Sequence, residues 1–514
     1  MTIDEIGANG IAHVRLNRPR KYNGLSLQMF QAIESSILTL RNSIEEKSIR
    51  AVILSGEGKA FCAGLDVNAV RASGNIRDTI ETLLRREDGR RDNLAQSVGY
   101  LWRELDVPVF AAVHGVCFGG GIQIALGADM RFSTPKAKFS IMEAKWGIIP
   151  DMSGSITLRE LVPMSVANKL TWTGEIFDGY AAKEYGLCDE IVEDPVGHAV
   201  AFVEALGLKT PNEAKAYKED LARKRRKRFR PLSRKMATND DASVLKGSPG
   251  GGSLGSFPEV SVVDGTIASV TLNASSGALV RVPDMCSRLA KDTSLRAAII
   301  DFGEAHSPAT NDKFDASILS LAASAIRRLP FPVVAILCGG EESDSVATAV
   351  DPGHVALSLA ADLRYTASSS RLDWVDWPRS DFFVERLGEL VGREHAGAMA
   401  THVTADILDA ENARLLGLVD VVCASPADAR VKALSFLTDL KEKNPDAVVA
   451  AKDLFVRTWH ADEDTALLVE SEIQRELMLS YNMMRCAVSN FLPSWVPRPP
   501  FRSRMKRDLL SLGC

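Results

Sequence analysis

Three patterns of hydrophobic and polar residues in the first part of the chain predict strands and a helix. Over residues 11–16 apolar and polar side chains alternate, which is the period of a half-buried strand. Residues 51–56 are an apolar run that ends at a turn signal, Ser-Gly, as in a strand buried on both faces. Residues 115–129 combine a short strand, three consecutive glycines and an apolar helical stretch. This last pattern places a glycine-rich turn between a strand and a helix.

The three glycines in this turn suggest a site for an oxyanion. Gly119, Gly120 and Gly121 have no side chain that would keep a ligand oxygen away from their backbone N–H groups. These N–H groups lie at the start of the expected helix, where the helix dipole also favours negative charge, as an enolate would require. Such a turn can equally cradle a phosphate or allow close packing of a helix, so it does not decide the chemistry alone.

A second segment makes the interpretation more specific. Residues 61–66 read Phe-Cys-Ala-Gly-Leu-Asp, and together with residues 115–129, in this order and spacing, they resemble the enoyl-CoA hydratase/isomerase (crotonase) superfamily. The resemblance extends over roughly residues 5–205. It implies an α/β fold of ββα-spiral type and an oxyanion hole formed by the backbone N–H groups of Leu65 and Gly120.

Further segments match the same family. Residues 17–25 resemble its early turn, against which the adenosine part of CoA packs, and residues 139–143 and 147–151 resemble its second active-site stretch. Residues 174–192 resemble its closing helix and strand. The resemblance implies that a CoA thioester contacts residues of the turn and of the two glycine segments, namely Lys21, Tyr22, Ala63, Gly64, Asp66 and Gly119.

The carboxylates of this stretch decide which reaction the resemblance implies. Hydratases of the family use two glutamates. One of them matches Glu143, and the position of the other is occupied in this chain by Gln123, whose amide cannot exchange protons at neutral pH. Isomerases that move a double bond from position 3 to position 2 work largely with the glutamate at Glu143. Asp151 matches an acid of the dienoyl-CoA isomerases. We therefore expect a double-bond shift, with enoyl-CoA hydration and dienoyl-CoA isomerisation as alternatives.

An internal repeat doubles the number of expected units. Five segments of the first half have counterparts in the same order in the second half, at residues 267–273, 294–300, 331–335, 361–365 and 416–420. The sequence thus predicts an α/β protein of two tandem crotonase-like (ββα spiral) domains with C-terminal helices. The expected parts are a catalytic domain (1–230), a flexible basic and glycine-rich linker (231–258), a degenerate domain (259–490) and a proline-rich basic tail (491–514).

The second unit keeps the repeat but loses the catalytic residues. The segment matching residues 61–66 contains Pro308, which has no N–H, and the glycine turn is followed by an acidic insertion at residues 341–344. Ala356 stands at the Gln123 position, and Asp376 at the Glu143 position. We expect a structural domain that supplies terminal helices, near residues 444–478, which the first unit lacks. A wholly non-catalytic acyl-CoA-binding scaffold is the alternative from a different class, but the hole, Glu143 and Asp151 persist together in the first unit.

The composition of the chain limits the kinds of molecule that it is expected to bind. The formal charge of −5 argues against a general nucleic-acid binder, and the eight cysteines show no metal-ligand spacing, so we expect reduced thiols and no metal. No apolar run is long enough to span a membrane, and no leader is evident. We expect a cytoplasmic protein, with mitochondrial and peroxisomal locations left open. It needs no cofactor because a CoA thioester is the substrate, and we expect a homo-oligomer, a trimer or a pseudo-hexamer of units.

Overall fold

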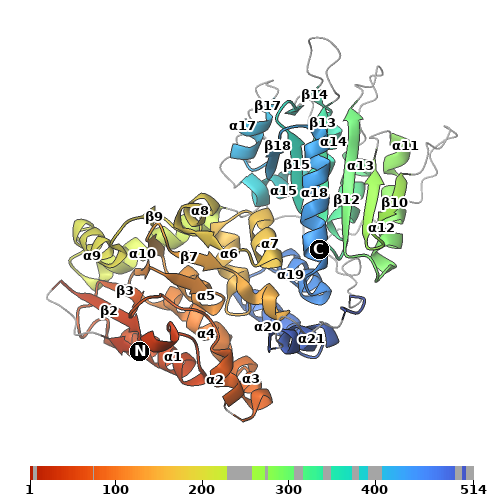
Figure 1. The fold of residues 1–514 in the computed structure, drawn as a ribbon. Helices are drawn as coiled ribbons and strands as arrows, with labels where there is room; N and C mark the ends of the chain where they lie inside the picture. The colour runs from red at the N-terminus through yellow and green to blue at the C-terminus, as the bar shows by residue number, and fades with distance from the viewer. Residues whose placement is uncertain are drawn as a thin grey trace. The chain divides into compact units, whose positions relative to one another are not determined.

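The computed structural model describes residues 1–3, 9–72, 74–228, 258–272, 276–305, 316–339, 349–372, 381–391, 408–491 and 500–504. The chain forms two compact units (Figure 1). The first unit contains Met1–Val162, Leu170–Arg228 and Leu454–Pro493, and the second contains Pro163–Lys169, Phe229–Asp453 and Ser494–Cys514.

The first unit is built on a six-stranded sheet in which all neighbouring strands are parallel except the first pair. Its strands, in order across the sheet, are β1 (Thr2–Ile3), β2 (Ile11–Leu16), β3 (Ala51–Gly56), β4 (Val109–Val113), β6 (Met130–Ser133) and β9 (Glu190–Ile191). A smaller sheet contains β5 (Val116–Phe118), β7 (Lys138–Ser140) and β8 (Phe177–Asp178). The strands expected at residues 11–16 and 51–56 are confirmed.

Helices surround the sheet of the first unit, and several begin at side-chain caps. Ser26 accepts a hydrogen bond from Met29 at the start of α1, and Asn93 forms a capping box at the start of α4. The helices and 3₁₀ turns are η1 (Pro19–Lys21), α1 (Leu27–Ser43), α2 (Val67–Ala72), α3 (Ile76–Leu84), α4 (Leu94–Tyr100), η2 (Leu101–Glu104), α5 (Gly120–Leu126), η3 (Met142–Trp146), α6 (Gly154–Leu161), α8 (Gly179–Tyr185), α9 (Pro195–Ala205), α10 (Pro211–Arg228), α20 (Glu463–Met478) and α21 (Tyr481–Phe491). The division between the units falls within α7 (Met164–Thr173) and α19 (Pro445–Thr458).

The core of the first unit lies partly between the sheet and α9. This helix packs against β3, β4 and β6. Phe110 and Phe132, on neighbouring strands, have ring centroids 6.0 Å apart, and Phe202 of α9 meets Phe110 edge to face. This face of the sheet is therefore filled by side chains and belongs to the core.

The second unit has the same strand arrangement as the first. Its main sheet has the order β10 (Glu259–Val263), β11 (Ile267–Thr271), β12 (Ala297–Ala305), β13 (Val333–Gly339), β15 (Leu363–Ala367) and β18 (Val421–Cys423), with only the first pair antiparallel. Its small sheet contains β14 (Ala349–Val350), β16 (Arg371–Leu372) and β17 (Leu408–Asp409). Its helices are α11 (Ser276–Leu279), α12 (Val282–Lys291), α13 (Ala316–Arg327), α14 (Pro352–Ser358), α15 (Asp381–Val391), α17 (Ala410–Leu415) and α18 (Pro426–Lys441).

A buried lysine–aspartate pair occurs at corresponding places in both units. In the first, Lys218 of α10 lies 3.1 Å from Asp129, which also accepts a hydrogen bond from the first residue of β4. In the second, Lys452 of α19 lies 2.7 Å from Asp362, which accepts from the first residue of β13. Both lysines also donate to backbone carbonyls, so each buried ammonium group has both a carboxylate and a carbonyl oxygen as partners.

An arginine–aspartate pair is repeated in the same way. Arg131 of β6 and Asp189 are joined by two hydrogen bonds, one from the arginine backbone N–H and one from its guanidinium group. In the second unit the backbone N–H of Arg364, on β15, donates to Asp420, and the guanidinium group forms an ion pair with the same carboxylate, at 2.7 Å as in the first unit. The two units therefore share buried contacts as well as strand order.

The structure differs from the expected domain ranges at two places. Pro163–Lys169, expected within the first domain, belong to the second unit. Residues 454–490, expected within the second domain, belong to the first unit, where α20 packs on α6 and α21 on η3. Apolar residues of α20 are buried there, and a helix follows its apolar face rather than its place in the sequence. Nearly all of the expected linker (231–258) and most of the expected tail (491–514) lie outside the described residues.

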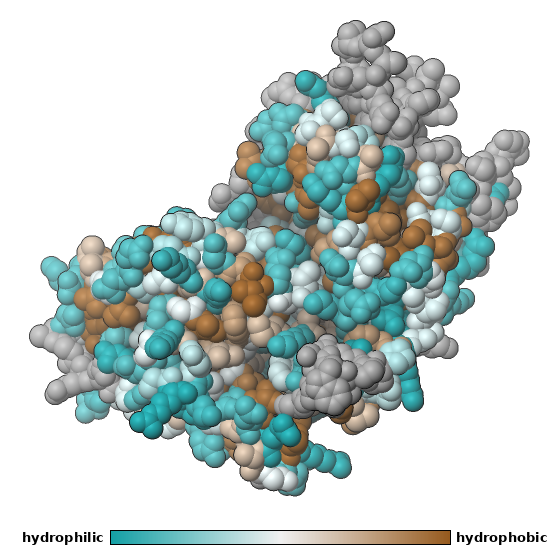
Figure 2. Space-filling model, in the orientation of Figure 1, coloured by the Kyte–Doolittle hydropathy of each residue, from teal (hydrophilic) through white to brown (hydrophobic). Residues whose placement is uncertain are grey.

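The visible surface is mostly hydrophilic. In Figure 2 the hydrophobic side chains on this face form small separate groups among hydrophilic ones. Among the described residues, no helix is long and apolar enough to cross a membrane.

Candidate active site

The two glycine-containing segments singled out in the sequence lie side by side. The backbones of Cys62 and Cys117 form a parallel β-bridge, and the Cys62 carbonyl accepts a hydrogen bond from the N–H of Phe118 at 3.0 Å. Both thiols are buried, and burial raises the pKa of Cys62 to about 12, so this cysteine is an inert packing residue. The pairing brings residues 63–65 next to the start of α5.

Glycine is needed at this junction for reasons of space and backbone conformation. Gly64 has a φ of +82°, and a Cβ built on it would lie 2.7 Å from the carbonyl oxygen of Phe118. Gly119, just before α5, has a φ of +51°. L-residues with side chains seldom adopt such angles, so the glycines allow the two segments to approach closely.

Two backbone N–H groups at the junction are available to a ligand. In the described part of the chain, the N–H groups of Leu65 and Gly120 donate no hydrogen bond to the protein. Their neighbours are engaged, because Gly64 donates to Cys62 Sγ, Asp66 to the Leu25 carbonyl and Gly119 to the Ser140 carbonyl. The pair expected to form the oxyanion hole is thus the pair whose donors are unused.

The junction opens into a cavity of about 350 Å³ within the first unit. Its walls are mainly apolar, and its polar lining is confined to a few side chains. The lining residues include Phe30, Ala63, Gly64, Leu65, Val70, Ile80, Leu83, Leu84, Gly119, Gly120, Met142, Glu143, Trp146, Ile148, Asp151, Met152, Gln474, Met478 and Met483.

Glu143 is the buried carboxylate of the cavity. It lies on η3, and its Oε1 is the nearest atom, at 3.5 Å, to a Cβ built on Gly119. Oε1 accepts a hydrogen bond from Gln123, whereas Oε2 is buried and has no hydrogen-bond partner among the described residues. Burial raises the pKa of Glu143 to about 7. The group can therefore both take and return a proton near neutral pH.

Gln123 is held in one orientation by hydrogen bonds at both ends of its amide. Its Nε2 donates to Glu143 Oε1 at 2.6 Å, and its Oε1 accepts from the Met152 N–H at 2.8 Å. Because the Met152 N–H is always a donor, the amide oxygen must face it and the NH₂ group must face Glu143. Gln123 is buried and makes these contacts to the protein, so it orients Glu143 rather than a water.

Asp151 lies in the same cavity and is partly exposed to it. Removal from bulk water raises its pKa well above the usual range, and the negative charges of Glu470 and Glu143 raise it further. The structure thus brings two of the predicted catalytic side chains, Glu143 and Asp151, into one cavity, and the third, Gln123, is hydrogen-bonded to Glu143 behind its wall.

The predicted CoA contacts are divided between the cavity and its surroundings. Ala63, Gly64 and Gly119 line the cavity. Lys21 and Tyr22 are exposed on the adjacent turn, where the Tyr22 carbonyl accepts from the Ala63 N–H. Asp66 pairs with Arg18 at 3.0 Å and accepts from the Ala69 N–H at the start of α2, which is a structural role.

Sequence reasoning missed the residues that α20 contributes. Glu470 and Gln474 are buried, and Gln474 lines the cavity although more than 300 residues separate it from Glu143 in the chain. Both interrupt the apolar stripe of α20, which has a period of three and four residues. A carboxylate and an amide in such a stripe are the signal that could have identified them.

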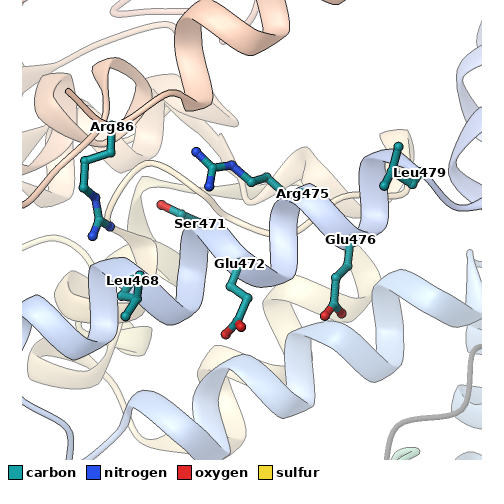
Figure 3. A pocket seen from close by; sticks show the side chains of 7 residues that line it. All are labelled: Arg86, Leu468, Ser471, Glu472, Arg475, Glu476 and Leu479. Atoms are coloured by element: carbon teal, nitrogen blue, oxygen red, sulfur yellow. The ribbon is translucent and has the colours of Figure 1, made fainter. Parts of the chain in front are cut away.

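The opposite side of α20 is polar and lies outside this cavity. Figure 3 shows Glu472 and Glu476 pointing away from the side of α20 that carries Ser471 and Arg475. Glu472 pairs with Arg457 at 3.0 Å and is mostly exposed. Glu472 is thus an exposed glutamate on the same helix as the buried Glu470.

The matching positions of the second unit are only partly described. Ala356, at the Gln123 position, is buried in α14. Pro308, Asp376 and the acidic insertion at residues 341–344 lie outside the described residues.

Comparison with known proteins agrees with the geometry of the first unit. A model of the enoyl-CoA hydratase/isomerase family matches residues 7–242. The Delta(3,5)-Delta(2,4)-dienoyl-CoA isomerase of Arabidopsis thaliana, named as peroxisomal, is 30% identical over 42% of this chain and 79% of its own. The (E)-benzylidenesuccinyl-CoA hydratase of Thauera aromatica is 29% identical over 41% of this chain and 78% of its own. A solved enoyl-CoA hydratase from Bacillus anthracis is 27% identical over 43% of this chain and 81% of its own, with a TM-score of 0.38.

The chain belongs to the enoyl-CoA hydratase/isomerase family and is an enzyme of that family. The first unit therefore has a crotonase-like α/β fold, as the sequence predicted.

Proposed function

We propose that this enzyme shifts a double bond of a 3-enoyl-CoA thioester to give the conjugated 2-enoyl-CoA. Glu143 takes a proton from C2, and the electron pair moves into the thioester to form an enolate. The N–H groups of Leu65 and Gly120 stabilise the enolate oxygen. Protonation at C4 by the same carboxyl group then leaves the double bond between C2 and C3. No cofactor beyond the CoA of the substrate takes part.

The observation that carries this proposal is the bridge made by Gln123. Hydration needs a second titratable group to activate water while the first protonates the α-carbon. Here the second position is an amide, held between Glu143 and the Met152 N–H. A single carboxyl group with one unbonded oxygen is sufficient for proton transfer from C2 to C4.

Dienoyl-CoA isomerisation is a second candidate because Asp151 is present. Glu143 and Asp151 line one cavity, and the pKa of each is raised. A similar protein at 30% identity is named as a Delta(3,5)-Delta(2,4)-dienoyl-CoA isomerase. With a 3,5-dienoyl substrate, the Asp151 carboxyl group would transfer a proton at the end of the conjugated system that lies far from the thioester.

A panel of 2-enoyl-, 3-enoyl- and 3,5-dienoyl-CoA thioesters tests these functions. Hydration adds the mass of one water, whereas isomerisation leaves the mass unchanged and alters the ultraviolet absorption. We expect conversion of the 3-enoyl esters. If the dienoyl ester alone is converted, the second candidate replaces the first, and binding of esters without any conversion would favour the scaffold alternative.

The pH dependence follows from the raised pKa of Glu143. The base must be ionised to take a proton, so kcat/KM for a 3-enoyl ester should rise with pH, with a midpoint near 7. Asp151, Lys145 and Arg71 line the same cavity and are the other charged groups to consider. Initial rates measured from pH 5 to 9, roughly two units on either side of this midpoint, check the prediction. A flat profile across neutral pH would exclude Glu143 as the base.

Gln123→Glu should convert the enzyme partly into a hydratase. The new carboxyl group would share a proton with Glu143, because two carboxylates this close cannot both be ionised. We expect hydration of a 2-enoyl ester to rise by about tenfold or more. Gln31→Glu, on the exposed side of α1, is the matched control and should change nothing. Efficient hydration by the unaltered enzyme, with no isomerisation, would show that Gln123 does not select the reaction.

We also propose that the two units arose by tandem duplication and that the second is a degenerate crotonase-like domain. The identical strand orders and the repeated Asp129–Lys218 and Arg131–Asp189 contacts support this. From the resemblance we further propose a homo-oligomer, a trimer or a pseudo-hexamer of units, which light scattering on the purified chain would test. A cytoplasmic location stays a prediction from the sequence.

A further inference from the structure

The segment that carries Asp151 has few backbone partners of its own. Residues 149–155 comprise the end of the connection between η3 and α6 and the first two residues of α6, and four of their N–H groups donate to side chains instead of to the backbone. Gln123 accepts from one of them, whereas Glu470 and Gln474, both on α20, accept from the other three. The shape of this wall of the cavity therefore depends on α20.

Glu470 is the central group of this arrangement. It is completely buried and accepts hydrogen bonds from the N–H groups of Ser153 and Ser155, from Ser155 Oγ and from Gln96 Nε2, at 2.6 to 3.1 Å. All these partners are donors, so they favour the ionised carboxylate, although burial raises its pKa. The negative charge also lies at the N-terminus of α6, where it is favourable.

Ser153 gives an independent sign that the segment is held in place. Its φ of +68° lies in the left-handed region, which residues other than glycine seldom adopt. Such a conformation persists only where surrounding contacts maintain it, and it is frequent near active sites. The contact here is the 2.8 Å hydrogen bond from Ser153 N to Glu470.

We propose that Glu470 is a positioning residue of this active site: it holds residues 149–155 so that the Asp151 carboxyl group faces the cavity beside Glu143. Its charge has a second effect, because it helps to keep the proton on Asp151. Glu143 acts on Asp151 in the same direction, and Lys145 and Arg71 also line the cavity. The inference rests on the proposed function only for the choice of assay.

The first test is the titration of Asp151 in Glu470→Gln, which keeps the size of the side chain and removes its charge. The full chain, labelled with ¹³C at aspartate carboxyl groups, is titrated without substrate, and Asp151→Asn identifies the signal. We expect the pKa of Asp151 to fall by on the order of one unit. Glu472→Gln, on the exposed side of α20, is the matched control and should leave the titration unchanged. An unchanged Asp151 titration in Glu470→Gln would overturn the proposal.

The second test separates position from charge and uses turnover of a 3-enoyl ester. Glu470→Asp keeps the charge but withdraws it by one methylene group. Because Met152 of residues 149–155 holds Gln123, and Gln123 in turn orients Glu143, kcat should fall by about 10- to 100-fold while KM changes little. Glu472→Asp should keep the kcat of the unaltered enzyme. Glu470→Asp also tests the proposal if Glu470→Gln does not fold. Full turnover by Glu470→Asp would contradict a positioning role. If the unaltered enzyme converts no ester, the proposed function fails, and the Asp151 titration still tests whether Glu470 acts on Asp151.

Discussion

Replacing Glu143 by glutamine should reduce isomerase turnover by a factor of about 10² to 10⁴, the usual contribution of a positioned base. This range corresponds to about 3 to 5.5 kcal/mol of transition-state stabilisation. The amide has nearly the same shape and can still face Gln123, so the affinity for CoA esters should change little. Steady-state rates with a 3-enoyl ester, together with the dissociation constant of a saturated acyl-CoA, measure both quantities.

The control for this variant is Glu193→Gln, an exposed carboxylate before α9. It removes the same charge from the protein without touching the cavity, and its kcat should equal that of the unaltered enzyme. If Glu143→Gln retains full turnover, Glu143 has no part in the mechanism, and Asp151 would be the next base to consider. A large loss of ester affinity would instead assign Glu143 to binding.

A fragment of residues 1–250 should be insoluble or inactive. It lacks residues 454–493, which belong to the first unit. Leu467, Ile473 and Leu477 of α20 are completely buried, and each such side chain stabilises a fold by roughly 1.5 to 3 kcal/mol. Their joint loss approaches the whole free energy of unfolding of a domain, about 5 to 15 kcal/mol. Solubility after expression, thermal unfolding and turnover are the measurements.

The full-length variant Asp376→Asn completes this comparison. It changes the one acid of the second unit that stands at the Glu143 position. If residues 259–514 contribute structure rather than chemistry, this variant keeps its turnover while the fragment loses it. A soluble and fully active fragment 1–250 would show that the first unit needs no C-terminal helices.

The hydrophobic pattern predicted central strands of the first unit, one from an alternating period and one from a continuous apolar run. The alternation in residues 11–16 and the apolar run in 51–56 became β2 and β3. The glycine turn at 119–121 was predictable because glycine alone permits the close approach that the structure shows at Gly64 and Gly121. The repeat was visible because four of the five echoing segments overlap strands of the main sheets of the two units.

The roles of polar side chains were harder to predict. For Asp66 the sequence suggested a contact with CoA, which stays a prediction, but it did not indicate that Asp66 pairs with Arg18 and caps α2. A sequence motif gives the position of a carboxylate, but its partners come from other elements. The raised pKa of Glu143 and the two-ended bonding of Gln123 likewise depend on burial, which only the packed structure establishes.

The sequence by itself determined the local elements and the family, and it predicted Leu65 and Gly120 as the backbone donors of an oxyanion hole. These features depend on neighbouring residues, through apolar periodicity and the absence of a Cβ at glycine. The sequence also suggested that helices near residues 444–478 complete the first unit, but only the tertiary structure decided that α20 is part of it and that Glu470 and Gln474 hold the segment with Asp151. The physical reason is that a helix is placed by where its apolar face is buried, and that can join residues more than 300 positions apart.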